Sequence, residues 1–324
     1  MLDVLRHATK RAAPSAGHWF AREAAIMGTS IHVELFGKDE RAANVAIDAV
    51  MAEMQRIDGA MSTYKASSEL SRINRDAARM PVHVSEEMFD LLARALEFSR
   101  LSDGAFDITY AAAGHLYDYR ERIRPSEEQL AQARQAIGWR NLVLHEADRT
   151  VRFTQPGVRL DLGGFAKGHA VNNAAAILHK HGVKHGAVAA GGDSRVIGDR
   201  LGRPWTVGVR DPRRPGQVVA LLPLEDAAVS TSGDYERFFE ADGERHHHVI
   251  DPRTGKSARG VHSVTVIGPE GLVTEALSKI VFVLGVEQGM KFVEAMPGTD
   301  AVVIDAEGRL HYSTGLARGN AARR

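Results

Sequence analysis

The order of apolar patterns along the chain constrains its fold most, because strand-like and helix-like segments both occur but do not alternate strictly. Residues 30–36 alternate apolar and polar side chains, which is the period of a half-buried strand. Apolar residues from Ala46 to Met61 then recur every three or four positions, which predicts a helix capped by Asp39. A purely parallel Rossmann-type sheet would need strict alternation of strand and helix. We therefore expect an α+β fold with two intimate lobes.

The remaining patterns extend this mixed order to the end of the chain. No repeat of solenoid or propeller period interrupts it. The patterns predict a helix from Ser85 to near Gly104, a helix from the capping box Ser126–Gln129 to Gly138, hairpins over 141–154 and around Asp242-Gly243, short strands at 187–190, 205–209, 218–222 and 264–267, helices over 272–284 and 287–295, and a hairpin over 302–312.

Composition excludes several classes of protein and site. The 324 residues include no cysteine, which excludes disulfides, thiolate metal ligands and a thiol nucleophile. Lys plus Arg equals Asp plus Glu, at 41 each, so charge gives no reason to expect nucleic acid or an anionic membrane as partner. Residues 1–20 lack the apolar run of a signal peptide or a membrane span. As written the chain is expected to be cytoplasmic, or periplasmic if an export signal has been lost from its start.

A glycine pair, Gly163-Gly164, joins the end of an apolar strand to a predicted helix that carries Lys167 in its first turn. Glycines at such a turn let backbone N–H groups approach a phosphate, and the helix N-terminus and Lys167 add positive potential. The segment is not a Walker loop, because the glycine spacing and the following Ser or Thr are missing. Its alternative interpretation is a tight turn with a solvated lysine.

A second glycine pair, Gly191-Gly192, follows another short strand. Two such loops in one chain suggest a long ligand with several polar groups, although each loop alone is also ordinary turn chemistry. Hydroxyl groups are concentrated in the segment 230–235, where they either bind a ligand or close a turn.

The segment HHHVIDPRTG at 246–255 packs three imidazoles and a carboxylate before a turn. In a regular strand His246 and His248 share one side and His247 the other, so the three cannot bind one metal ion. His248 is the best candidate for a general base, since Asp251 and the turn after it are placed to orient its ring. The alternative is a packed or surface histidine.

Eight segments in this order resemble the ApbE-like family of FAD:protein FMN transferases, and they span most of the chain from residue 27. The resemblance implies a T-fold-like α+β architecture over 26–318, between an N-terminal extension (1–25) and a tail (319–324). It also implies an enzyme that uses FAD and Mg²⁺ to attach FMN to a threonine of a partner flavoprotein, with release of AMP. The segments are STYKASSELSRIN (62–74), GAFDIT (104–109), DLGGFAKGHAV (161–171), AGGDSRVIG (190–198), WTVGVRDP (205–212), STSGDYERFF (230–239), HHVIDPRTG (247–255) and TEALSKIVFVLG (274–285).

The resemblance also assigns roles by position. Tyr64 corresponds to the residue that stacks on the isoalloxazine ring, for which an aromatic face is suited. His248 would deprotonate the acceptor hydroxyl, and Gly164, Gly191 and Gly192 would form the two phosphate-binding turns. The remaining residues assigned to the FAD site are Glu69, Asp107, Asp161, Lys167, Thr231, Ser232 and Asp234.

Two positions depart from the family pattern. The family's metal ligands are an Asp and a Thr four residues later, where this chain has Glu275 and Lys279. Glu275 keeps an oxygen ligand that Mg²⁺ accepts, whereas a charged lysine cannot ligate. The Lys279 ammonium either lies near the diphosphate and takes over part of the cation's role, or pairs with Glu275, as residues four apart on a helix do. The second departure is Ala189, where many relatives carry an asparagine.

The leading hypothesis is therefore an FAD:protein FMN transferase. The acceptor pattern of the family, Asp-Gly-x-Ser/Thr-Gly-Ala-Thr, is missing from this chain, so the acceptor is expected to be another protein. The alternatives are a non-catalytic FAD-binding or flavin-delivery protein, a Mg²⁺-dependent FAD pyrophosphatase, and a zinc hydrolase built on His246, His248 and Asp251. The sequence specifies no oligomeric state.

Overall fold

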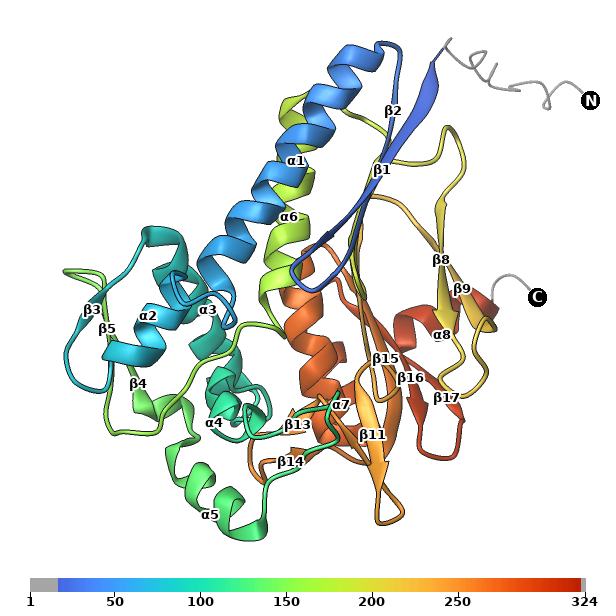
Figure 1. The fold of residues 1–324 in the computed structure, drawn as a ribbon. Coiled ribbons are helices and arrows are strands. Elements are labelled where there is room, and N and C mark those ends of the chain that lie inside the picture. The colour runs from blue at the N-terminus through green and yellow to red at the C-terminus, as the bar shows by residue number, and fades with distance from the viewer. Residues whose placement is uncertain (1–16, 322–324) are drawn as a thin grey trace, which may run out of the picture.

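An eight-stranded antiparallel sheet, called the main sheet below, runs through the centre of the computed structural model, which describes residues 17–321 (Figure 1). Strands distant in sequence pair in it, for example β2 with β6 and β7 with β10. In spatial order the strands are β1 (His18–Ile26), β2 (Thr29–Gly37), β6 (Gly186–Ala190), β7 (Asp193–Ile197), β10 (Ala228–Gly233), β15 (Val261–Gly268), β16 (Asp300–Asp305) and β17 (Leu310–Tyr312).

Three helices cover one face of the main sheet, and a two-stranded ribbon packs on the other. The helices are α1 (Glu40–Met61), α6 (Ala166–Lys180) and α7 (Gly271–Glu294), and they lie side by side (Figure 1). The ribbon consists of β8 (Trp205–Arg210) and β9 (Val218–Leu224). Its apolar side chains form a smaller cluster with those main-sheet side chains that point away from the helices. Because strand side chains alternate between the two faces, each face buries its own set of apolar residues.

A second lobe is inserted between β2 and β6. Its apolar residues belong to the same continuous core as those beneath the main sheet, which confirms two lobes in intimate contact. No helix of either lobe within residues 17–321 is long and apolar enough to cross a membrane. The lobe contains α2 (Glu69–Asp76), β3 (Val82–His83), α3 (Glu86–Leu101), α4 (Ala111–Gly114), α5 (Glu127–Ala136), β4 (Leu142–His145), β5 (Thr150–Phe153) and the short 3₁₀ helices Ile108–Tyr110 and Trp139–Asn141.

Several local signals are confirmed. The capping box of α5 forms, with both hydrogen bonds between Ser126 and Gln129 present. Asp242 and Gly243 both have positive φ, as a type I′ turn requires, between β11 (Phe238–Ala241) and β12 (Glu244–His247). The two helices expected near the C-terminal end form one element, α7, that breaks at Gly285, where φ is 77°.

The predicted N-terminal extension is wrong for residues 18–25, which form β1 and pair with β2 along its whole length. This strand covers the edge of β2, and Trp19 packs edge-on against Trp205 of the ribbon at 5.4 Å between ring centroids. Residues 1–16 lie outside the described residues. At the other end, α8 (Thr314–Ala321) includes residues that were assigned to the tail.

Candidate functional site

The first glycine turn lies directly against α7. Asp161 begins the turn, and its Oδ1 accepts the backbone N–H of Gly163 at 2.5 Å. A Cβ added at Gly164 would stand 3.3 Å from Cε of Lys279, so the stem of this lysine runs along the backbone of the turn. The turn and Lys279, more than 100 residues apart in sequence, are therefore in contact.

The second glycine turn connects β6 to β7 and touches β10. Gly191 has φ of 61°, which favours glycine, and a Cβ at Gly192 would stand 2.5 Å from the carbonyl oxygen of Thr231. The backbone N–H of Thr231 donates to the carbonyl of Gly192 at 2.8 Å. This close approach requires both glycines and brings Asp193, the first residue of β7, beside the hydroxyl groups of β10.

Lys167, Asp193, Glu275 and Lys279 form what we call the inner charge cluster. Lys167 Nζ lies 2.7 Å from Asp193 Oδ2 and also contacts Glu275 Oε1. The other oxygen of Glu275 accepts the backbone N–H of Gly168 at 2.7 Å. Because Asp193 and Glu275 are 2% and 0% exposed, both carboxylates depend on these partners rather than on water.

Three serine hydroxyls connect the carboxylates to Lys279. Ser230 donates to Asp193 Oδ1 at 2.5 Å, and its hydroxyl lies 3.2 Å from that of Ser278. Ser278 and Ser232 lie 2.8 Å apart, and Lys279 Nζ donates to Ser232 at 2.7 Å. The predicted helix pair between Glu275 and Lys279 is wrong, because Lys167 takes the Glu275 carboxylate and the serines take Lys279.

Burial and neighbouring charges shift the pKa values of three members of the cluster. Burial alone would lower the pKa of Lys167, but Asp193 and Glu275 outweigh it and raise that pKa. Burial, reinforced by Asp193, raises the pKa of Glu275 against the opposing effect of the two lysines. Burial lowers the pKa of Lys279; Lys167 adds to this effect, and Glu275 and Asp193 oppose it.

His248 follows β12 and lies within electrostatic range of this cluster. Burial, and after it the charge of Lys279, lower the pKa of His248 to about 3, so the ring is neutral at neutral pH. Its Nδ1 is buried and has no hydrogen-bond partner among the described residues. Asp251 does not orient the ring as predicted, because both of its carboxylate oxygens bind Arg253.

The other two histidines of the segment have packing roles. His247 is 4% exposed, and its Nε2 lies 2.8 Å from the carbonyl oxygen of Ala258. His246 stacks on Phe239 at 5.1 Å between ring centroids. Residues 17–321 contain no group of three His, Cys, Asp or Glu side chains arranged to hold a metal ion, which contradicts the zinc-hydrolase alternative.

Glu69 and Asp107 form no hydrogen bond or ion pair with the inner charge cluster among residues 17–321. Glu69 opens α2, and its two oxygens accept from the backbone N–H and the hydroxyl of Ser85, the N-cap of α3. Asp107 is buried and accepts from the backbone and the hydroxyl of Thr109. Both carboxylates hold local structure in the second lobe.

Thr231 and Ser232 were predicted to act together, but they lie on opposite faces of β10. Ser232 faces α7, whereas the hydroxyl of Thr231 lies 2.9 Å from that of Thr265 on the neighbouring strand. Adjacent residues of a strand point to opposite faces, so only one of the two belongs to the cluster.

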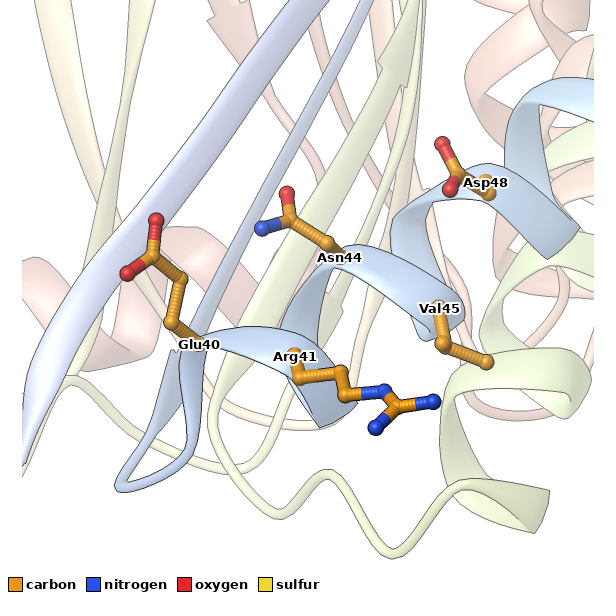
Figure 2. Close-up of a pocket in the computed structure, with 5 residues that line it drawn as sticks. All are labelled: Glu40, Arg41, Asn44, Val45 and Asp48. Atoms are coloured by element: carbon orange, nitrogen blue, oxygen red, sulfur yellow. The ribbon is translucent and has the colours of Figure 1, made fainter.

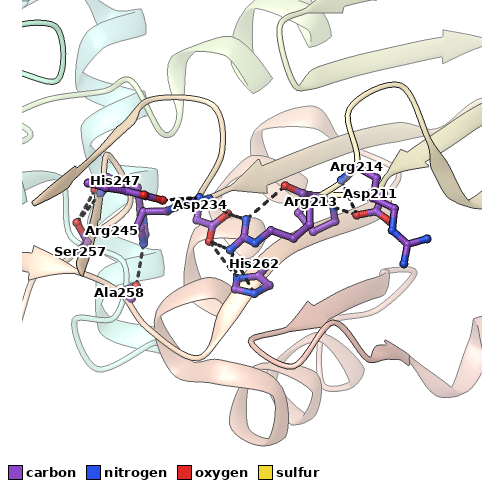
Figure 3. A network of polar contacts seen from close by, with 11 residues as sticks. Asp211, Arg213, Arg214, Asp234, Arg245, His247, Ser257, Ala258 and His262 are labelled. Atoms are coloured by element: carbon purple, nitrogen blue, oxygen red, sulfur yellow. Dashed lines mark hydrogen bonds and ion pairs between the residues drawn. The ribbon is translucent and has the colours of Figure 1, made fainter. Parts of the chain in front are cut away.

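Asp234 belongs to a separate set of polar contacts, which we call the outer ion network: Asp234, Arg213, His262 and Arg245 (Figure 3). Arg213 donates to both oxygens of Asp234, at 2.8 and 2.6 Å. Burial opposes ionisation of Asp234, but the hydrogen bonds from Arg213 prevail and lower its pKa. The carboxylate is 4% exposed and has a saturated set of partners.

Tyr64 lies in the turn between α1 and α2, and its side chain is 93% exposed. Its phenol lies within electrostatic range of Tyr110 and Tyr119. Burial, and after it the nearby Asp161, which begins the first glycine turn, raise the pKa of Tyr110. An exposed aromatic ring therefore stands near the first glycine turn without packing of its own.

The inner charge cluster does not fit a magnesium ion. All four carboxylate oxygens of Asp193 and Glu275 are engaged by Lys167, Ser230 or the N–H of Gly168. The position where an oxygen ligand is needed carries the Lys279 ammonium, which has no lone pair to donate.

Two hollows on the surface lie away from these residues. One is lined by residues between 40 and 48 of α1 (Figure 2). Two of them, Asn44 and Asp48, accept hydrogen bonds from Arg22. The other is lined by α3 and the segment around Trp139 and β4. None of the residues predicted for the site lines either hollow.

Sequence reasoning missed Asp193, Ser230 and Ser278 as members of the cluster. Asp193 directly follows the glycine pair, and this position was the available signal. Ser230 belongs to the hydroxyl-rich segment 230–235, whereas Ser278 carries no signal of its own, and only the packing of α7 on β10 brings the two together.

Known proteins with similar sequences share one name. Residues 27–303 match the sequence model of the ApbE family. A protein of Treponema pallidum called FAD:protein FMN transferase is 33% identical over 92% of this chain and 87% of its own length. One of Haemophilus influenzae with the same name is 30% identical over 83% of this chain and 81% of its own.

Solved structures agree with the sequence matches. The ApbE protein of Thermotoga maritima superimposes with a TM-score of 0.86 at 33% identity, over 93% of this chain and 99% of that one. A flavin transferase ApbE of Vibrio cholerae gives a TM-score of 0.82 at 27% identity, with the same coverage. The mixed α+β fold predicted from sequence is therefore confirmed.

Proposed function

The chain belongs to the ApbE family, and we propose that it is an FAD:protein FMN transferase, which moves the FMN half of FAD onto a threonine of a partner flavoprotein and releases AMP. The family model covers most of the chain, and the relatives that match it carry this activity as their name. FAD is the substrate, and the acceptor flavoprotein is the partner.

The observation that carries the proposal is a buried set of cations beside a neutral imidazole. The first glycine turn, Lys279 and the serines of β10 surround one point, and His248 lies within electrostatic range of it. Backbone N–H groups at a glycine turn that opens a helix, together with a lysine, are suited to a diphosphate. A neutral imidazole without a hydrogen-bond partner on Nδ1 is suited to accept a proton.

The transfer step exchanges one P–O bond for another, so it needs no electron donor or acceptor. The threonine oxygen attacks the phosphorus of the FMN half and forms a new P–O bond, while its proton passes to His248. The P–O bond to the AMP half breaks, and AMP leaves with the electron pair. When the anionic diphosphate binds nearby, its negative charge raises the pKa of His248 above the value in the protein without FAD. Lys279 stabilises the charge that develops on the leaving phosphate.

We assign Tyr64 to the flavin ring. Its exposed side chain near the first glycine turn offers a free aromatic face for stacking. We expect Glu69, Asp107 and Asp234 to act through the structure they hold, because each already has hydrogen-bond partners within the protein.

The test is incubation of the purified chain with FAD and an acceptor that carries the pattern Asp-Gly-x-Ser/Thr-Gly-Ala-Thr. We expect the intact mass of the acceptor to increase by one FMN moiety and one AMP to appear per labelled acceptor. A variant acceptor with Ala in place of the threonine serves as control and stays unlabelled. Release of FMN and AMP with no labelled acceptor would make the chain a pyrophosphatase, and FAD bound without AMP release would make it a binding protein.

A further inference from the structure

The two lysines of the inner charge cluster are not equivalent. Lys167 contacts both buried carboxylates, whereas the hydrogen bonds of Lys279 go to the hydroxyls of Ser232 at 2.7 Å and Ser278 at 3.4 Å. No ion pair joins Lys279 to a carboxylate among residues 17–321. The ammonium of Lys279 is thus held by neutral groups only.

A half-buried ammonium that contacts no carboxylate directly is costly, because hydroxyls replace only part of the water it loses and Glu275 and Asp193 act on it only from a distance. The free energy of the cluster would improve if an anion came into contact with Lys279. The stem of Lys279 runs along Gly164, so the ammonium lies beside a turn whose own N–H groups are suited to phosphate oxygens.

The same geometry removes the place of a divalent cation. Each of the four oxygens of Asp193 and Glu275 already binds an N–H, ammonium or hydroxyl group, so Mg²⁺ would have to compete with Lys167 for both carboxylates. An ion placed here would also lie beside the two ammonium groups of Lys167 and Lys279. The cluster therefore has a lysine ammonium, which is part of the protein, where the related enzymes are expected to bind a metal ion.

We propose that Lys279 supplies the positive charge that a divalent metal would otherwise bring to the diphosphate, so that this protein binds FAD and transfers FMN without metal. The inference rests on the proposed function for its substrate. It makes Lys279 a residue that touches the diphosphate and stabilises AMP as it leaves.

The decisive comparison is between the FAD affinity in excess EDTA and the FAD affinity in millimolar Mg²⁺. Quenching of flavin fluorescence measures the dissociation constant in each condition. The wild-type protein should bind FAD with the same dissociation constant, within about twofold, in both conditions. The variant Lys279→Thr should bind FAD about tenfold to a hundredfold more weakly in EDTA, the equivalent of one charge-assisted hydrogen bond. Mg²⁺ should recover part of this loss, because the threonine replaces a repelling ammonium with an oxygen ligand.

Matched variants separate charge from folding. Lys291→Thr removes an exposed lysine from the same helix and should leave FAD affinity unchanged in both conditions. Lys279→Arg keeps the charge and should stay independent of Mg²⁺, and Lys279→Met keeps the stem without the charge and should lose affinity in EDTA. Circular dichroism of each variant checks that it is folded.

Each outcome decides the inference separately from the proposed function. Wild-type affinity for FAD that rises tenfold or more with Mg²⁺ overturns the inference but leaves the transferase intact. Equal affinity in EDTA and Mg²⁺ without labelling of the acceptor in either condition supports metal-free FAD binding, but it overturns the transferase and with it metal-free transfer. If the wild-type protein binds no FAD in either condition, the inference and the proposed function are both overturned. If Lys279→Met binds FAD in EDTA as tightly as the wild type, the role of Lys279 is overturned.

Discussion

The inner charge cluster and the outer ion network both surround buried carboxylates with cations, but they distribute the charges differently. In the outer network, Arg213 donates to both oxygens of Asp234, and Arg245 shares its charge between Asp234 and Glu240. In the inner cluster, Lys167 contacts both carboxylates, whereas the direct contacts of Lys279 are with serine hydroxyls. Each cation of the outer network contacts a carboxylate within the protein, whereas Lys279 of the inner cluster contacts none directly among the described residues.

In a chain of zero net charge, this difference distinguishes charged residues that stabilise the fold from charged residues that are available to bind a ligand. A cation that already contacts a carboxylate stabilises the fold, and removing its partner costs stability. A cation held by hydroxyls alone is available to a ligand, and removing it costs binding. The two regions should therefore respond to substitution in different measurements.

The largest effect is expected at His248, beside the inner cluster. The variant His248→Gln should lower the rate of FMN transfer by about a hundredfold to ten-thousandfold, because it removes the group that accepts the hydroxyl proton. Its affinity for FAD should stay close to that of the wild type. Single-turnover labelling of the acceptor measures the rate, and His179→Gln, an exposed position at the end of α6, is the control. An unchanged rate would remove His248 from the mechanism.

The next effect concerns stability of the inner cluster. The variant Glu275→Gln should lower the free energy of unfolding by about 3–5 kcal/mol, because it leaves buried lysine charge without compensation. Urea unfolding followed by circular dichroism measures this, and Glu287→Gln, exposed on the same helix, should change stability by less than about 0.5 kcal/mol. If Glu275→Gln unfolded at the wild-type urea concentration, the carboxylate would not be the counter-charge of Lys167.

The outer network should respond in stability alone. The variant Asp234→Asn should lower the free energy of unfolding by about 1.5–3 kcal/mol through the loss of charge-assisted hydrogen bonds from Arg213. FAD affinity should remain that of the wild type. Urea unfolding and flavin fluorescence on the same sample test both statements. A loss of FAD affinity comparable to that of Lys279→Thr would join the two regions into one site.

Acid should act on the outer network in a definite direction. The pKa of Asp234 is lower in the folded protein than its ordinary value of 3.8, so its stabilising contribution is present above pH 3.8 and is lost as the pH falls through the folded pKa. The wild type should therefore lose more stability than Asp234→Asn when the pH is lowered from 5 to about 3. Urea midpoints of both proteins at these two pH values measure the difference, and parallel losses would contradict it.

The smallest effect is expected at Tyr64, which has no packing to lose. The variant Tyr64→Ala should leave the free energy of unfolding within about 0.5 kcal/mol of the wild type. It should weaken FAD binding by about 0.5–1.5 kcal/mol, the value of one aromatic stack. Tyr64→Phe keeps the ring and should keep the affinity. A phenylalanine variant as weak as the alanine variant would assign the contribution to the hydroxyl instead.

Local signals predicted the elements of the fold well, because each depends on residues close in sequence. The capping box at Ser126, the turn at Asp242-Gly243 and the break at Gly285 are examples. The strand order of the main sheet depends on pairs such as β2 with β6, which no local pattern encodes. The strand at 18–26 was missed, because its burial comes from pairing with β2 and packing of Trp19 on the ribbon.

The candidate site was predicted in part for the same reason. Lys167 and the two glycine turns stood out by composition, but the partner of Lys167 lies 108 positions away at Glu275. The spacing of Glu275 and Lys279 favoured a pair within α7, and tertiary contact with α6 overrides it. Only the side-chain alternation along β10 was available in advance to separate Thr231 from Ser232.

The structure of the protein crystallised with FAD in the presence of EDTA tests the central claim most directly. We expect the diphosphate to lie about 3 Å from Lys279 Nζ and beside the first glycine turn, with His248 facing the phosphorus of the FMN half. The outer ion network should be unchanged by the ligand. FAD bound away from Lys279, or FAD that enters the crystal only with a metal ion between the diphosphate and Glu275, would contradict the claim.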